Sequence, residues 1–470
     1  MIYDGPYRDD ALTSPELLGL WGHRQTAVIL VAGVVPSGDA QLEAGDSMRT
    51  RIFFGLLFLS GALVAQTEVK LTASDAAAND VFGSSVALSN NTVLVGASGD
   101  GNTGSAYVFM RDQGGIDMWG QVIRITASDA ASGDSFGAAV AIDGDIAVVG
   151  NFTDADMGTD TGSAYVFSRN QGGANMWGQV TKLTASDAAM NDRFGASVSI
   201  HGDTVAVGAD QDSYDAIIQG GAVYVYYRNQ GGADMWGQVR KVTPGDGDSN
   251  DGFGTAVSID ADSIVVGAPF SNPGSAVFGG SAYVFLRNQG GSDMWGQIAK
   301  LVSSDVAGFD LFGGAVSIDG DTSVVGAISN TEGGIQGGSA YVFSRNQGGA
   351  ENWGQVAKMT ATDAANGDNL GISVATSGDT ALVGAYLDVG GGSAYLFSRD
   401  QGGADMWGQV TRFAGMDTSG SDQFGRTVSV DGGTAVIGAP LNGDAGTNSG
   451  SAYVLFGAPV PVELQRFSVD

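Results

Sequence analysis

The residues of this sequence with the greatest capacity for chemistry are aspartates, and they occur in pairs. Seven times the chain places two aspartates five positions apart, shortly before a Phe-Gly or Leu-Gly dipeptide. Two carboxylates are the catalytic pair of glycoside hydrolases, and a ring of carboxylates attracts cations or a basic partner. Seven equivalent pairs have no distinguished member, which favours an architectural interpretation in which each aspartate accepts backbone hydrogen bonds in a turn. The pairs are Asp75/Asp80, Asp129/Asp134, Asp187/Asp192, Asp246/Asp251, Asp305/Asp310, Asp363/Asp368 and Asp417/Asp422.

Other reactive side chains are scarce. The chain has no cysteine, which excludes disulfides, zinc–thiolate sites and cysteine nucleophiles. Its two histidines, His23 and His201, leave little room for histidine catalysis. No phosphate-binding loop of the Gly-x4-Gly-Lys-Ser/Thr type occurs, nor a Gly-x-Ser-x-Gly nucleophile elbow with a usable histidine. We therefore expect a protein that binds a ligand and is not an enzyme.

The charge balance narrows the choice of partner. With 51 acidic and 21 basic residues the formal net charge is −30. A nucleic-acid-binding protein needs a basic stripe to offset the phosphate charge, and none is present here. An acidic surface suits solubility or weak binding of hard cations through carboxylates.

The elements that position these residues follow from seven repeats of about 56 residues. Each repeat contains four strand-like runs: one opening with Phe-Gly, an apolar run ending in Gly, a Gly-Ser-Ala-Tyr-Val-Phe-like run, and a run opening with Trp-Gly-Gln. No apolar stripe of period 3.6 persists, so the fold is predicted to be all-β. The dipeptides that open the repeats are Phe82-Gly83, Phe136-Gly137, Phe194-Gly195, Phe253-Gly254, Phe312-Gly313, Leu370-Gly371 and Phe424-Gly425.

Four strands repeated seven times predict a seven-bladed β-propeller of four-stranded blades. The seventh repeat ends near Val454 without a Trp-Gly-Gln run, while Glu68 to Thr72 matches that missing fourth strand. We expect this amino-terminal strand to complete the last blade, which closes the ring without an exposed edge. The predicted propeller covers residues 66–456, and residues 457–470, with two prolines, form a linker or tail.

The amino terminus has a different character. Residues 1–47 match nothing later in the chain, and a basic segment from Met48 to Arg51 precedes an apolar run from Ile52 to Val64. This order is typical of a secretory signal peptide, and the run is shorter than the roughly 20 residues of a membrane helix. We interpret 1–47 as a misassigned extension and 48–65 as a signal peptide, which predicts a secreted or cell-surface protein with no membrane span after signal removal. The alternative is a genuine extension followed by a membrane anchor.

The Phe-Gly dipeptides, together with Val266-Gly267-Ala268-Pro269 and Ile437-Gly438-Ala439-Pro440, resemble the FG-GAP repeat. The resemblance covers all seven repeats, and the family includes the integrin α-subunit propeller and many secreted bacterial proteins. It implies a seven-bladed propeller used for ligand binding or cell adhesion, with calcium in some loops. The family's calcium loop follows the Gly-Ala strand. The corresponding candidate ligands in the second and third repeats are Asp154, Asp156, Asp160, Asp210, Asp212 and Asp215.

We thus expect a binding or adhesion scaffold whose partner is an extracellular protein or glycan. Contacts are expected from the loops that depart most from the repeat, 210–220, 269–280 and 328–338, because the repeated core leaves loops free to differ. A carbohydrate-binding or carbohydrate-active propeller is the first alternative, and a purely structural envelope or matrix protein is the second.

Overall fold

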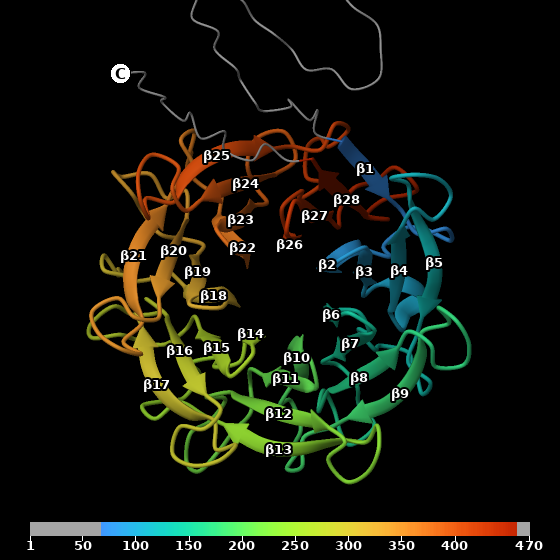
Figure 1. The fold of residues 1–470 in the computed structure, drawn as a ribbon, viewed down its shortest axis with the longest axis horizontal. Coiled ribbons are helices and arrows are strands. Elements are labelled where there is room, and N and C mark those ends of the chain that lie inside the picture. The colour runs from blue at the N-terminus through green and yellow to red at the C-terminus, as the bar shows by residue number, and fades with distance from the viewer. Residues whose placement is uncertain (1–66, 458–470) are drawn as a thin grey trace, which may run out of the picture. The chain divides into compact units, whose positions relative to one another are not determined.

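The computed structural model describes residues 67–457, which form seven four-stranded antiparallel sheets arranged as blades around a central axis (Figure 1). The predicted all-β, seven-bladed propeller is therefore confirmed. The predictions for residues 1–47, for the signal peptide at 48–65 and for the tail beyond residue 457 lie outside the described residues. No helix among residues 67–457 is long and apolar enough to cross a membrane.

In each blade the strands follow one another from the central axis of the ring outwards (Figure 1). Blade 1 contains β2 (Phe82–Ser89), β3 (Thr92–Ala97), β4 (Ser105–Arg111) and β5 (Trp119–Ile125), with a short 3-10 turn, η1 (Asp100–Asn102). Blade 2 contains β6 (Ala139–Asp143), β7 (Ile146–Asn151), β8 (Ser163–Ser168) and β9 (Gly178–Leu183). Blade 3 contains β10 (Phe194–His201), β11 (Thr204–Ala209), β12 (Ala222–Arg228) and β13 (Trp236–Val242). Blade 4 contains β14 (Ala256–Asp260), β15 (Ser263–Ala268), β16 (Ser281–Leu286) and β17 (Gly296–Leu301).

The remaining three blades repeat this order. Blade 5 contains β18 (Phe312–Asp319), β19 (Thr322–Ala327), β20 (Ser339–Ser344) and β21 (Gly354–Met359). Blade 6 contains β22 (Leu370–Ser377), β23 (Thr380–Ala385), β24 (Ser393–Ser398) and β25 (Gly408–Phe413). Blade 7 contains β26 (Thr427–Asp431), β27 (Thr434–Ala439), β28 (Ser451–Phe456) and, as its outer strand, β1 (Thr67–Leu71).

Ring closure is the contact that joins the two ends of the described chain. Strand β1 pairs antiparallel with β28, with Thr67 opposite Phe456 and Leu71 opposite Ala452. The strand that begins the array thus supplies the missing outer strand of its last blade (Figure 1). The expected closure is confirmed, and no blade of the ring is left short of a strand.

The Phe-Gly dipeptide lies where neighbouring blades pack against each other. Phe136 is fully buried and meets Tyr165 edge-on at 5.4 Å between ring centroids. Gly137 follows at φ +93°, and a Cβ there would lie 2.3 Å from the carbonyl oxygen of Ser105 in the preceding blade. Only glycine permits that approach, so the dipeptide recurs because each blade must meet the next in the same way.

The repeated aromatic side chains belong to the core. The tryptophans that open the fourth strands, Trp119 to Trp407, are 2–8% exposed, and the tyrosines of the third strands are at most 1% exposed. Burial of such rings contributes about 1.5–3 kcal/mol each. These rings therefore fill space within and between the blades. The tyrosines are Tyr107, Tyr165, Tyr224, Tyr283, Tyr341, Tyr395 and Tyr453.

The up-and-down strands give the propeller two different faces. One face, here called the linker face, carries the blade-to-blade linkers and the loops between the second and third strands. The opposite face, here called the hairpin face, carries the turns between first and second strands and the loops between third and fourth strands. All the predicted site residues lie on the linker face.

Candidate functional site

The second aspartate of every pair holds the linker in a turn. In the linker before blade 2, Asp134 Oδ2 accepts the backbone N–H of Ala131 at 2.9 Å. The same bond, to the N–H three residues earlier, recurs in all seven linkers at 2.6–2.9 Å. The architectural interpretation of these aspartates is thus confirmed.

The first aspartate of each pair belongs to a different arrangement, here called the cation cluster. In blade 2 the Tyr165 hydroxyl donates to Asp129 at 2.9 Å and to the loop residue Asp154 at 2.8 Å. Tyr165 lies opposite Lys182 in the sheet, and the Lys182 ammonium reaches both carboxylates at 2.8 Å. A cation cluster therefore consists of a linker aspartate, a third-strand tyrosine, a fourth-strand cation and a residue of the loop between the second and third strands.

The cation cluster recurs around the ring with a variable loop residue. Every described blade pairs its linker aspartate with a lysine or arginine of its outer strand. The cations of blades 1 to 7 are Arg124, Lys182, Lys241, Lys300, Lys358, Arg412 and Lys70. The loop residues in the same order are Asp100, Asp154, Asp212, Ser271, Asn330, Asp388 and Asn442.

Sequence reasoning assigned no role to these cations. The signal was present, because a lysine or arginine recurs in every Gly-Gln-Val-x-Lys-Leu-like run. Such a residue lies directly opposite the repeated tyrosine, as in the pairing of Tyr165 with Lys182. The repeated tyrosine and the repeated cation can be linked only through the register between the third and fourth strands, which the sequence pattern alone left open.

Burial and hydrogen bonding oppose each other in the blade 2 cluster. Desolvation disfavours the Lys182 ammonium, yet hydrogen bonds to Asp129, Asp154 and Asp156 leave its pKa above the ordinary value. Desolvation likewise raises the pKa of Asp154, but hydrogen bonds from Lys182 and Ser163 bring it below its usual range. The group is therefore held as an ammonium among carboxylates at neutral pH.

The calcium candidates of the second repeat are only partly brought together. Asp154 and Asp156 lie with Asp129 in a group whose carboxylate oxygens are within 4.8 Å of one another. The Lys182 ammonium contacts all three at 2.7–2.8 Å. Asp160 is not part of this group; its carbonyl accepts the Arg193 N–H at 3.0 Å. With Lys182 in place, these residues do not fit calcium, since the position that a metal ion would take among the carboxylates is held by an ammonium.

The candidates of the third repeat are divided between two cations. Asp212, with a side chain only 2% exposed, accepts from Lys241 at 2.8 Å. Asp210 faces Arg193 at 3.4 Å, and burial raises the pKa of this carboxyl. Asp215 joins neither pair and takes a left-handed backbone conformation at φ +51°. The three carboxylates are thus not gathered into one site.

One loop of the linker face departs from the repeat by exposing aromatic rings. Phe270, Phe278 and Phe309 are 43%, 38% and 59% exposed. They form a chain of edge-on contacts, 6.1 Å between the centroids of Phe270 and Phe278 and 5.7 Å between those of Phe278 and Phe309. We call these three residues the phenylalanine cluster. Two of them come from the loop predicted at 269–280, and the third comes from the linker before blade 5.

Two of these phenylalanines occupy backbone positions that do not suit them. Phe278 has φ +52° and Phe309 has φ +68°, in the left-handed region that costs a bulky residue about 1–2 kcal/mol. At the position of Phe309 five of the other six repeats place Asn or Gly with the same sign of φ, at Asn79, Gly133, Asn191, Asn250 and Gly367, and the sixth has Ser421. At the position of Phe278 the other repeats have Asn102, Asp160, Gln219, Gln336, Gly390 and Asn448, and all of these except Gln336 have positive φ.

A family profile for the FG-GAP repeat matches the chain seven times. The seven-bladed ring of repeated four-stranded sheets, joined through glycine contacts, already defines the protein as a repeat propeller. The chain belongs to the FG-GAP repeat family, whose profile covers residues 66–109, 119–167, 177–226, 236–285, 295–343, 353–397 and 407–456. A search of curated proteins finds no match. FG-GAP repeats are typical of extracellular proteins, and their propeller is a ligand-binding scaffold.

Proposed function

We propose that this protein is a secreted or cell-surface binding scaffold that holds an extracellular protein or glycan on the linker face of blades 3 to 5. The phenylalanine cluster carries the proposal. Its rings are exposed, they contact one another, and they break the sevenfold symmetry at one place. Strained, exposed positions that no core packing explains are characteristic of binding surfaces.

The neighbouring loops extend this surface. Val277 beside Phe278 is 52% exposed. The corresponding loops of blades 3 and 5 expose Ile218 at 65% and Ile335 at 41%. These residues lie in the three loops expected to contact a ligand. A partner with an apolar face would bury all three loops together.

The engaged aspartates support binding over catalysis. The second aspartates of the pairs are occupied by linker turns, and the first by tyrosines and cations. A carbohydrate-active propeller would need two carboxylates free to act on a substrate. We therefore propose no catalytic residue. The family resemblance implies calcium in these loops, but in blade 2 the Lys182 ammonium holds the position that such an ion would take.

The test compares two variants against a panel of extracellular proteins and glycans. Phe278→Asn combined with Phe309→Asn gives blade 4 the residue types of the other repeats, so the fold is expected to persist. The control, Met176→Ala with Met406→Ala, removes residues that are 52% and 61% exposed on the hairpin face. We expect the phenylalanine variant to lose at least tenfold in affinity for a panel binder and the control to lose none. Equal affinities of both variants would contradict the proposed surface.

A further inference from the structure

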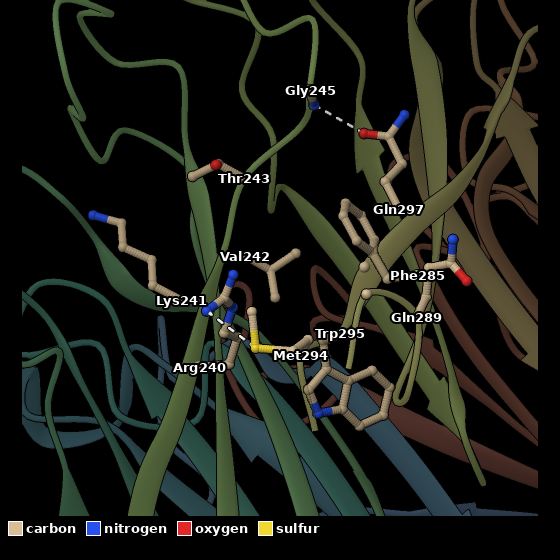
Figure 2. A pocket seen from close by; sticks show the side chains of 12 residues that line it. Arg240, Lys241, Val242, Thr243, Gly245, Phe285, Gln289, Met294, Trp295 and Gln297 are labelled. Atoms are coloured by element: carbon tan, nitrogen blue, oxygen red, sulfur yellow. Dashed lines mark hydrogen bonds between the residues drawn. The ribbon is translucent and has the colours of Figure 1, made fainter. Parts of the chain in front are cut away.

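A cavity of about 300 Å³ lies between blades 3 and 4 (Figure 2). None of the residues that line it belongs to the phenylalanine cluster. One wall comes from the end of β13 and the linker after it, from Arg240 to Gly245. The other comes from Phe285 of β16 and from the hairpin of residues 289–297. Ligand sites in proteins measure about 300–1,000 Å³, so this cavity suits a small molecule of one ring.

The blade contact beside the cavity makes one hydrogen bond, as do the contacts of Gln179 with Ser128 and of Gln409 with Thr362, whereas three other contacts make two. Between blades 2 and 3, the Gln238 side chain accepts the Ser186 N–H at 3.0 Å and donates to the Ser186 hydroxyl at 3.0 Å. Gln121 with Ser74 and Gln355 with Ser304 make the same double contact. Between blades 3 and 4 the linker has Gly245, which gives Gln297 its N–H at 2.8 Å and has no hydroxyl to offer (Figure 2). The amide nitrogen of Gln297 is left without this partner.

Arg240 supplies the cavity with a charge. The equivalent outer-strand residues are Val69, Ile123, Thr181, Ala299, Ala357 and Thr411, so neither the strand nor the blade contact requires an arginine. Its guanidinium rests 3.9 Å from the Met294 sulfur, as Figure 2 shows, and forms no salt bridge with any described residue. Within residues 67–457 all other lysines and arginines except Arg426 are ion-paired.

The lining is positive in a strongly acidic protein. The chain carries a net charge of −30, yet no aspartate or glutamate is among the twelve residues that line the cavity. Lys241 also lines it, but its ammonium is held by Asp187 and Asp212. Arg240 is therefore the cation left for a ligand, and an unpaired guanidinium binds a carboxylate through charge-assisted, often bidentate hydrogen bonds.

The other lining groups suit a ring with hydroxyls. Val242, Phe285 and Trp295 form a buried apolar floor. Gln289, Gln297 and Thr243 add amides and a hydroxyl at its rim. An apolar surface with a few polar groups is the composition of small-molecule sites. A sugar ring presents both a C–H face and hydroxyl edges.

We propose that this cavity binds a carboxylate-bearing sugar, a hexuronate residue, with Arg240 holding its carboxylate. The site goes beyond the proposed ligand surface on the linker face, since the two share no residue. Binding through Arg240 does not depend on the phenylalanine cluster.

Calorimetric titration of the full chain with sodium glucuronate, glucose and sodium benzoate tests the proposal. Arg240→Thr places the residue of blades 2 and 6 at this position. Gly245→Ser restores the missing hydroxyl, and the added Cβ meets Gln297 Oε1 at an ordinary 3.5 Å. Both variants are therefore expected to fold. Arg426→Ser, which removes the other unpaired arginine, is the control.

We expect saturable glucuronate binding at least tenfold tighter than that of glucose or benzoate. Arg240→Thr should weaken glucuronate binding at least tenfold, Gly245→Ser several-fold, and Arg426→Ser not at all. Equal binding of glucuronate and glucose would overturn the role of the carboxylate, and equal binding of benzoate would overturn the sugar. Unchanged glucuronate affinity in Arg240→Thr, or no binding to the wild-type protein, would overturn the site itself.

Discussion

The Lys182 ammonium lies 2.8 Å from a carboxylate oxygen of Asp154. The same ammonium contacts Asp129 and Asp156, so one lysine bridges three carboxylates on two different segments of blade 2. The linker and the loop between the second and third strands are thereby tied to the outer strand. A cation of the chain itself holds the loop in which the family resemblance implies calcium.

Removing that cation should destabilise blade 2. Lys182→Ala leaves three carboxylates within 4.8 Å of one another, with Asp154 nearly buried. Loss of one partner from a buried ion group costs about 3–5 kcal/mol, and partial exposure of Lys182 reduces this to about 2–3 kcal/mol. Urea unfolding measures the change. Calcium at millimolar concentration should stabilise the variant and leave the wild-type protein unchanged.

Lys300→Ala in blade 4 is the matched control for this lysine. Lys300 pairs only with Asp246, whose side chain is 53% exposed, and the loop residue there is Ser271. An exposed pair contributes about 0–1 kcal/mol. Equal losses in the two variants, or calcium stabilisation of the wild-type protein, would show that the lysine does not stand where a metal ion would bind.

The tyrosine hydroxyls should contribute differently to the free energy of unfolding in different blades. Tyr165 donates to Asp129 and Asp154, whereas the buried Tyr283 hydroxyl has no hydrogen-bond partner in the structure. Hydrogen bonds to charged groups contribute about 1.5–3 kcal/mol. Tyr165→Phe is therefore expected to lower the free energy of unfolding by about 2 kcal/mol and Tyr283→Phe to leave it nearly unchanged. Denaturant unfolding of both variants checks this, and a reversed order would contradict it.

Asp192 should make part of the stability depend on pH. Burial raises the pKa of its carboxyl to about 6, although the Ala189 N–H opposes the shift, and the negative charge of Asp212 adds to it. The folded protein thus binds this proton more tightly than the unfolded chain. The stabilisation is complete below the unfolded pKa, near 3.8, and is lost as the pH rises through about 6.

The variant Asp192→Asn isolates this contribution, because an asparagine oxygen can still accept the Ala189 N–H. The stability of the wild-type protein relative to the variant should rise by roughly 1–2 kcal/mol between pH 7 and pH 4, given 1.36 kcal/mol per pKa unit and partial screening. Thermal unfolding across that range measures it. A constant difference between the two proteins would contradict the raised pKa.

Phe309→Asn should separate binding from folding. Asparagine tolerates the left-handed backbone at φ +68°, which relieves about 1–2 kcal/mol of strain. Loss of the edge-on contact with Phe278 costs about 0.5–1.5 kcal/mol. The stability of the variant should therefore stay within about 1 kcal/mol of the wild-type value while affinity for a panel ligand falls. A loss of 3 kcal/mol or more would mark Phe309 as a structural residue.

Much of the fold could be predicted because the same strand-forming runs recur at a regular spacing in all seven repeats. The spacing of the Phe-Gly and Trp-Gly-Gln runs fixed the strand order, and the match of Glu68 to Thr72 with the fourth strand predicted the closure by β1. Repetition also identified the second aspartate of each pair as a turn residue, whereas the first contacts a tyrosine and a cation instead. Each of these inferences rests on local sequence or on the period, which tertiary contacts did not alter.

The parts that could not be predicted depend on which residues of different strands, loops and blades lie opposite one another. The role of Lys182 required its pairing with Tyr165 across two strands. The contact of Phe309 with Phe278 joins a linker to a loop about 30 residues away. The cavity at Arg240 lies between the outer strand of blade 3 and residues of blade 4, so it depends on a contact between blades. Sequence patterns within one strand contain none of these distances.

Hydroxyl-radical footprinting of the protein with and without its tightest panel ligand tests the proposed binding surface most directly. Side-chain oxidation would be measured by mass spectrometry at Phe270, Phe278 and Phe309, with Met176 and Met406 of the hairpin face as internal references. If the linker face of blade 4 holds the ligand, oxidation of the three phenylalanines falls on binding and that of the two methionines does not. Unchanged oxidation of the phenylalanines under saturating ligand would contradict the proposed function.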